Sequence, residues 1–189
     1  MKKGFLCSLL FLLFFSLSAQ HSDGSSSGYK ITGEITGLGN DTVLLAYYFG
    51  GKQYASDTAY CTNGKFIFKG KKSLQGGMYL VVLPGNKYFD IIVSEQQFEI
   101  KTDINSLVPS MRFKNSKENT LFYEYLNFIT NKQSEVIPLR EAEKDASSSE
   151  KERIRKEIII IDQQVKEYQL DFQDQHPDIF FTKIIIRFT

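Results

Sequence analysis

The feature that most constrains the fold is a change in hydrophobic periodicity near residue 113. Over residues 29–103, apolar and polar residues alternate with a period of two between turn residues, which indicates short β-strands. From residue 114 onward, apolar residues recur at spacings of three and four, which indicates amphipathic helices. The chain is therefore predicted to be α+β, with a β domain over 29–103 and a helical connector region over 114–189.

About seven strands are expected in the β domain. In the first, Ile31 and Ile35 face one side, and the polar residues between them face the other. Residues 78–83 are continuously apolar, as in a central strand that is covered on both faces. The pair Asn63-Gly64 favours the positive φ angles of a tight hairpin. Short strands at regular spacing predict an antiparallel β-sandwich or a strongly twisted meander.

The aromatic residues of the β domain have two interpretations. They can line a ligand-binding groove, or they can fill the core of a small domain, which is the commoner role and the one we favour. The residues concerned are Tyr47, Tyr48, Phe49, Tyr54, Tyr60, Phe66, Phe68, Tyr79, Tyr88 and Phe89.

The helical region is predicted to begin at a capping box, with Asn115 as the N-cap and Glu118 reaching back to its amide. Pro138 lies where a second helix can begin. The three serines at 147–149 are expected to break the helix, and Ser149 with Glu152 can cap a new start. A single long helix with a weak patch at the serines is the alternative.

The second half of the helical region has a heptad seam. Fewer than three heptads are too short for a coiled coil, so we expect a helical hairpin that packs on the first helix or on the β domain. Residues 179–188 predict a short apolar helix, which must pack on something. If its partner is absent, its exposed surface favours self-association. The seam consists of Ile154, Ile158, Ile161, Val165, Tyr168 and Phe172.

The N-terminus has the parts of an export signal. Lys2 and Lys3 form a basic segment, residues 5–15 are a nearly unbroken apolar run, and small residues lead to an expected cleavage site after Ala19. The apolar run is about half the ~20 residues of a spanning helix, so we expect no stable membrane insertion after cleavage. Cys7 begins this run instead of closing it, which argues against lipidation. We therefore expect a signal peptide over 1–19, a flexible tether over 20–28, and a periplasmic or envelope location.

Charge and composition exclude several functions. Without Lys2 and Lys3 the formal net charge changes from +1 to −1, which leaves no electrostatic footprint for nucleic acid. Cys61 is the one cysteine after processing, so neither an internal disulfide nor a CxxC centre can form. We expect it to be a half-buried strand residue; a reactive thiol or an intermolecular link is the alternative. His21 and His176 lack ligand spacing, so no metal or cofactor site is predicted.

Three carboxylates near strand ends are the candidates for acid–base catalysis: Asp57, Asp90 and Glu95. Nothing in the sequence brings two of them together, and such carboxylates usually serve in turns or in solvent. We therefore assign no catalytic residue, and an enzyme is the least favoured hypothesis.

The chain resembles a family of envelope proteins of Gram-negative bacteria. The β domain is similar to their domain of unknown function in ITGEITGL (31–38), DTVLLAY (41–47), NGKFIFKG (63–70) and GMYLVV (77–82). The helical region is similar to the connector that follows that domain, in SKEN (116–119) and HPDIFFTKI (176–184). In that family, both typically precede a C-terminal thioredoxin-like domain of the thiol–disulfide oxidoreductase or peroxiredoxin-like type.

This resemblance implies a non-catalytic exported accessory domain that positions a redox domain or recognises its partner. The sequence ends at Thr189, where the family continues into the redox domain, so no catalytic residue is carried over and a truncated form is expected. The alternative is a free-standing exported module that uses the β-sandwich or the helical region to bind a protein or a small ligand.

Overall fold

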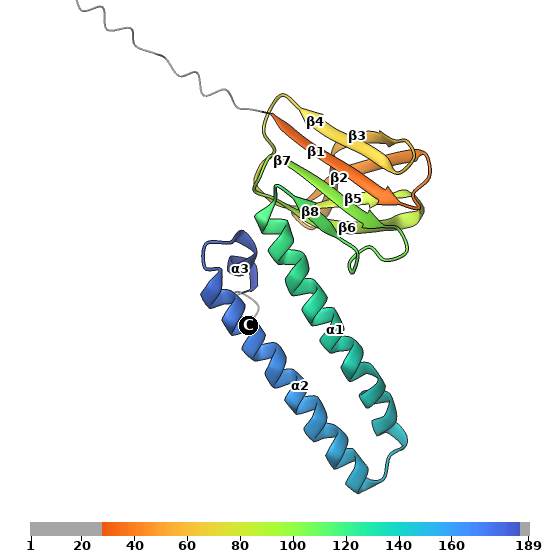
Figure 1. Cartoon of the computed structure of the whole chain (residues 1–189), viewed down its shortest axis with the longest axis vertical. Helices are drawn as coiled ribbons and strands as arrows, with labels where there is room; N and C mark the ends of the chain where they lie inside the picture. Colours follow the sequence, from red (N-terminus) through yellow and green to blue (C-terminus); the bar gives the residue numbers. More distant parts are fainter. Residues whose placement is uncertain (1–27, 186–189) are drawn as a thin grey trace, which may run out of the picture.

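The computed structural model describes residues 28–185 as a β domain followed by a long helical arm (Figure 1). The strands form two four-stranded sheets, in the orders β4-β1-β7-β8 and β3-β2-β5-β6. The α+β class is confirmed, and the β domain is a sandwich and not a meander. The strands are β1 (Tyr29–Thr36), β2 (Asp41–Phe49), β3 (Lys52–Cys61), β4 (Lys65–Gly70), β5 (Gly77–Leu83), β6 (Lys87–Val93), β7 (Gln97–Asp103) and β8 (Arg112–Lys114).

Two features of the sheets differ from the sequence prediction. β1 runs parallel to β7, from Lys30 opposite Gln97 to Thr36 opposite Asp103. The long connection between these two strands, which includes β2 to β6, permits such a parallel pairing. β8 extends the strands past residue 103 by pairing with β7. Three residues are too few to show an alternating pattern, so this eighth strand was missing from the prediction.

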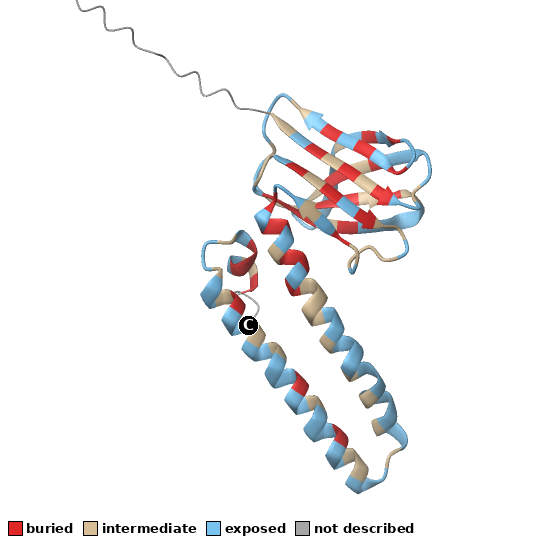
Figure 2. Ribbon diagram, in the orientation of Figure 1, coloured by how far each residue is buried: buried red, intermediate tan, exposed pale blue. Residues whose placement is uncertain are grey.

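The core of the β domain lies between the two sheets. Ile31 and Ile35 of β1 are buried there, as predicted. In β5, Leu80 and Val81 point to opposite faces and both are buried, which confirms a central strand covered on both sides. Figure 2 shows the buried residues alternating along the strands.

The Asn63-Gly64 hairpin is confirmed, and it links the two sheets. The φ angles are 49° at Asn63 and 77° at Gly64, which is the positive pair that a tight hairpin turn requires. A Cβ atom at Gly64 would lie 2.5 Å from the carbonyl oxygen of Ile35. Glycine is therefore needed at this position both for its backbone angle and for space.

The helical arm is an antiparallel hairpin of α1 (Lys117–Asp145) and α2 (Ser148–Gln175), closed by the short helix α3 (Phe180–Ile185). Pro138 lies inside α1, so the second helix predicted to begin there was wrong. Proline removes the amide that would pair with the carbonyl of Ser134. Because both residues are exposed, water can satisfy that carbonyl and the helix continues.

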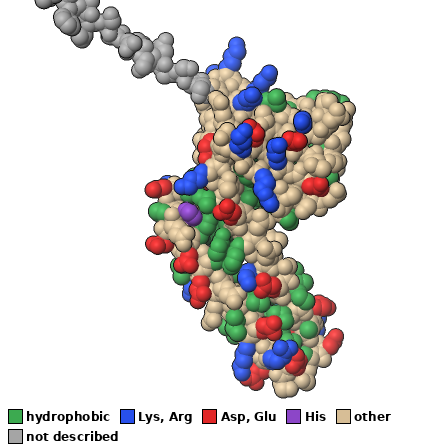
Figure 3. Space-filling view, in the orientation of Figure 1, with side chains coloured by type: hydrophobic (Ala, Val, Ile, Leu, Met, Phe, Trp, Pro, Cys, Tyr) green, Lys and Arg blue, Asp and Glu red, His purple; other side chains and the backbone are tan. Residues whose placement is uncertain are grey.

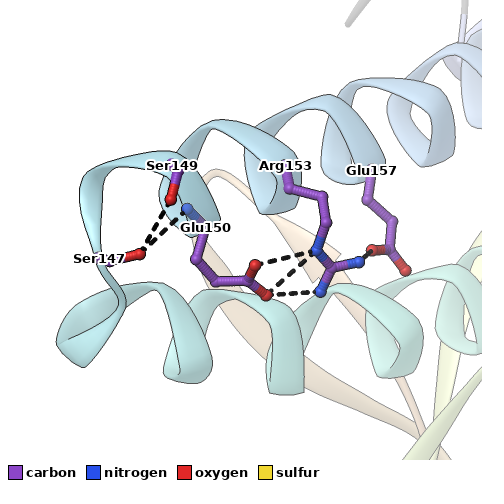
Figure 4. A network of polar contacts seen from close by, with 5 residues as sticks. All are labelled: Ser147, Ser149, Glu150, Arg153 and Glu157. Carbon is purple, nitrogen blue, oxygen red and sulfur yellow. Dashed lines mark hydrogen bonds and ion pairs between the residues drawn. The ribbon is translucent and has the colours of Figure 1, made fainter.

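The break at the three serines is confirmed, but the cap lies two residues before the predicted Ser149. Ser147 is the N-cap of α2, and its Oγ accepts a hydrogen bond of 3.4 Å from the Glu150 amide. Arg153 then binds the Glu150 carboxylate at 2.7 Å and lies 3.5 Å from the Glu157 carboxylate (Figure 4). This exposed network stabilises only the first turns of α2.

The short helix α3 packs on the arm itself. The ring centroid of Phe181 lies 4.7 Å from the ring centroid of Phe122, 5.1 Å from that of Tyr125 and 6.2 Å from that of Phe172. This aromatic cluster ties the three helices together at the end of the arm nearest the β domain (Figure 1). The predicted apolar helix over 179–188 thus has a packing partner, while its residues 186–189 lie outside the described residues.

The predicted signal peptide and residues 20–27 of the tether also lie outside the described residues. Within 28–185, no helix combines the length and the apolar character that crossing a bilayer requires.

Candidate functional site

The β domain and the helical arm meet at a joint between β6 and the start of α1. Asn119, in the first turn of α1, has no exposed surface. The Ile92 amide donates a hydrogen bond of 2.7 Å to its Oδ1, and its Nδ2 donates one of 2.6 Å to the Ile92 carbonyl. One turn later, the Tyr123 hydroxyl donates to the Asp90 carbonyl at 2.9 Å. Because β6 is an edge strand, these side chains take the place of a neighbouring strand.

A carboxylate from the β domain caps the first turn of α1. Glu95 accepts hydrogen bonds from the Ser116 hydroxyl at 2.8 Å and from the Lys117 amide at 2.9 Å. Ser116 is the N-cap, so the prediction of Asn115 was wrong by one residue. Asn115 has a φ of 62°, whereas an N-cap residue needs an extended backbone. The negative charge of Glu95 lies where the helix dipole is positive.

The electrostatics of Glu95 fit a structural role. Burial acts to raise the pKa of this carboxyl, but hydrogen bonds from Ser116, Ser94 and backbone amides outweigh burial and lower the pKa below its ordinary value. A general acid or base works best with a pKa near the working pH. Glu95 is instead held ionised as a helix cap.

The joint also reaches α3. The Glu118 carboxylate is buried and accepts a hydrogen bond of 2.8 Å from the Phe181 amide. The predicted capping box had Glu118 reaching back to the N-cap amide. In the structure Glu118 binds α3 instead, and Glu95 serves the first turn of α1.

The structure does not bring the three candidate carboxylates together. Asp57 accepts hydrogen bonds from the Tyr29 hydroxyl at 2.7 Å and from the Lys69 amide at 3.2 Å, and so links the two sheets. Burial and this hydrogen bond raise the pKa of Tyr29 to about 12. Asp57 and Asp90 lie on β3 and β6, the opposite edges of one sheet, and three strand spacings separate these edges by roughly 14 Å. Glu95 binds the first turn of α1 through Ser116 and Lys117.

Cys61 is a core residue, buried more completely than the predicted half-buried position. Burial raises the pKa of its thiol, so the unreactive thiol form dominates at neutral pH. Over residues 28–185, no group of three or more His, Cys, Asp or Glu side chains is arranged to hold a metal ion.

The aromatic residues of the β domain divide between core and surface. Phe66, Phe68, Tyr79 and Phe89 fill the core. At the β2–β3 turn, the rings of Tyr48, Phe49 and Tyr54 are exposed, with Phe49 72 % exposed. Phe49 packs edge-on against Tyr54 with a ring separation of 6.5 Å. We call these three residues the aromatic hairpin.

A second surface feature runs along the helical arm, between α1 and α2. It is a hollow of about 410 Å³, and Figure 3 shows hydrophobic side chains among the charged ones along the arm. An adjoining hollow of about 490 Å³ shares Arg140 with it and is also lined by Ile158 and Ile159. We call the two hollows the arm groove. The lining of the first is Ile129, Lys132, Gln133, Val136, Ile137, Arg140, Ile161, Asp162 and Val165.

Neither the joint nor the arm groove was predicted from the sequence. A signal for the groove was present in Ile137 and Ile159, which are apolar but lie off the predicted seam and are 67 % and 54 % exposed. The joint left no comparable signal, because Glu95 and Ser116 are 21 positions apart and neither belongs to a periodic pattern.

A domain of unknown function, DUF4369, covers residues 29–122. This range contains all eight strands and the first six residues of α1. The contacts of Asn119 with Ile92 and of Glu95 with Ser116 therefore lie within the match, and Tyr123 lies one residue beyond it. The resemblance to a domain of unknown function is thereby confirmed, and the match names no catalytic family. Comparisons with curated proteins and with solved structures gave no match.

Proposed function

We propose that this chain is a non-catalytic, exported accessory module in which the DUF4369 domain holds the helical arm in a fixed direction. The observation that carries the proposal is the joint. Asn119 binds the edge strand through two hydrogen bonds, and Glu95 caps the helix from the turn that follows that strand.

This joint differs from a hinge in its buried contacts. A hinge keeps few buried contacts, so that its backbone can rotate at small cost. Here Asn119 and Tyr123 are buried and bind the backbone of β6. A bend that breaks these hydrogen bonds while the groups stay buried costs about 1–3 kcal/mol for each group left unpaired, and a bend that lets water in still loses about 0.5–1.5 kcal/mol for each hydrogen bond. The arm therefore acts as a rigid spacer.

The resemblance to envelope thioredoxin-like proteins supports a more specific form of the proposal. In that form, the arm sets the position of a thioredoxin-like redox domain or holds the partner of such a domain. The chain's own part is mechanical and needs no catalytic residue, cofactor or metal.

The distance between the β domain and the far end of the arm tests this proposal. Nitroxide labels at Lys30→Cys on β1 and Asp145→Cys at the end of α1 report it by pulsed electron resonance. Both sites are exposed, buried Cys61 stays unlabelled, and the labelled protein begins at Gln20 and so lacks Cys7. We expect one narrow distance distribution, which broadens in Asn119→Ala and stays narrow in Asn131→Ala, an exposed asparagine of the same helix. A broad distribution in the otherwise unchanged protein would show a hinge and contradict the proposal.

Export is a separate part of the proposal and has its own test. We expect protein recovered from the envelope of a Gram-negative host to begin at Gln20 when its intact mass is measured. Full-length protein that stays in the cytoplasm would contradict export and would leave the mechanical role untouched.

The aromatic hairpin supports a second candidate function, a free-standing binding module. Exposed tyrosine and phenylalanine side chains supply large contact areas at small entropic cost. Peptides selected from a displayed library against the purified protein should bind it and lose binding to a Phe49→Ser/Tyr54→Ser variant. If all selected peptides bind both proteins equally, the hairpin is not a binding site.

A further inference from the structure

The arm groove contains two charged side chains that have no partner within the chain. Arg140 lies on α1 and Asp162 on α2, and both line the groove. Among residues 28–185, neither forms an ion pair or a hydrogen bond. Arg155 and Glu143, also beside the groove, are paired with each other at 2.6 Å. The two free charges are thus of opposite sign and lie on opposite sides of one apolar surface.

The register of the hairpin fixes how these charges are arranged. The Arg155–Glu143 ion pair joins the two antiparallel helices, so Arg140 lies level with about residue 158 and Asp162 with about residue 136. The two charges are therefore offset by about four residues, or roughly 6 Å along the arm. They lie diagonally across the groove.

The centre of this diagonal is apolar and exposed. By the register that the Arg155–Glu143 pair sets, Ile137 on α1 and Ile159 on α2 lie close to the midpoint between the two charges. Their side chains are 67 % and 54 % exposed. Large apolar side chains beside a hollow, with charges at its rim, are typical of an interface and not of a solvated helix face.

We propose that the arm groove is the contact surface of a homodimer, in which the arms of two copies cross face to face. A twofold rotation about an axis in the plane of the groove, midway between the two charges, exchanges their positions. Arg140 of each copy then meets Asp162 of the other, and Ile137 and Ile159 lie close to the axis and become buried. Such self-complementarity is what a twofold interface requires, and it favours a second copy over an unrelated helix.

Charge reversal tests the pairing directly. In sedimentation velocity at tens of micromolar, we expect the purified protein to be a dimer. Arg140→Asp and Asp162→Arg should each place like charges face to face and raise the dissociation constant on the order of tenfold or more. The double variant restores opposite charges and should restore the dimer. Glu167→Arg, the same change at an exposed site outside the groove lining, should leave the dimer unchanged.

Circular dichroism of each variant shows whether the arm is still folded, and Ile137→Ser supplies a second disruption that leaves the charges intact. A monomer at these concentrations would overturn the proposal. The proposal would also be overturned if the double variant dimerised no more tightly than the single variants. Self-association that none of the variants changes would place the contact elsewhere and overturn it too. The rigid joint is independent of these outcomes, because diluting the doubly labelled protein with excess unlabelled protein restricts its test to distances within one copy.

Discussion

The side chain of Asn119 binds both backbone groups of Ile92, accepting from its amide at 2.7 Å and donating to its carbonyl at 2.6 Å. These two hydrogen bonds close the free edge of β6 and fix the start of α1. An exposed strand edge is a hazard in most sheets, because it can pair with other chains. In this protein a helix occupies that edge, so one contact protects the sheet and orients the arm.

The first prediction concerns this contact. Asn119→Ala leaves the amide and carbonyl of Ile92 buried without partners, so we expect a loss of about 2–5 kcal/mol in the free energy of unfolding. Chemical denaturation followed by circular dichroism measures it. Asn131→Ala, at an exposed site, should change stability by less than about 0.5 kcal/mol. Equal effects of the two variants would show that the Asn119 contact contributes nothing.

The second prediction concerns the acid stability of the joint. The folded state lowers the pKa of Glu95 from 4.5, so its contribution is fully present above about 4.5 and is lost as the pH falls through the folded value. Glu95→Gln should therefore destabilise the protein by about 1–2 kcal/mol at pH 7 and have a smaller effect in acid. If the difference in unfolding free energy between the Glu95→Gln variant and the unchanged protein stays constant from neutral to acid pH, Glu95 does not act as a charged cap.

The third prediction concerns Asp90, whose ionised form should destabilise the fold, whereas that of Glu95 stabilises it. Desolvation raises its pKa from 3.8, so the folded state binds the proton more tightly, and stability falls as the pH rises from about 3.8 through the folded value. Asp90→Asn removes this charge. We expect the variant to have a higher melting temperature than the unchanged protein at pH 7, and the difference to vanish in acid. A lower melting temperature at pH 7 would mean that the Asp90 charge stabilises the fold.

The fourth prediction concerns the buried thiol. Cys61→Ser puts a hydroxyl in the core and should cost about 1–3 kcal/mol, while leaving the arm groove and any binding intact. Ellman's reagent should label Cys61 of the native protein far more slowly than that of the unfolded protein. Labelling at equal rates in the two states would show that Cys61 is not a core residue.

The sequence predicted the parts of the fold that local patterns determine. Alternation identified the core face of β1 at Ile31 and Ile35, because the direction of a strand side chain depends on near neighbours. The Asn63-Gly64 pair identified the turn between β3 and β4, because backbone angles in a tight turn also depend on near neighbours. The parallel pairing of β1 with β7 depends on the path of the whole chain. No local pattern carries that information.

The joint was unpredictable for a related reason. Asn115 is a good N-cap residue by type, and it also readily adopts the left-handed backbone that the structure shows there. Ser116 is the N-cap, and its hydroxyl donates a hydrogen bond to Glu95. Glu95 belongs to the β domain, and only the tertiary fold brings it into contact with Ser116. Pro138 was misread because a helix break depends on whether solvent can satisfy the freed carbonyl, and this follows from exposure and not from residue type.

The most direct test of the rigid joint is ¹⁵N spin relaxation across the backbone of the unmodified protein. If the joint is rigid, the amides of the β domain and those of α1 and α2 will fit one common rotational diffusion tensor. Two separate correlation times, with extra motion at residues 114–119, would show that the arm moves independently and would contradict the proposed positioning role.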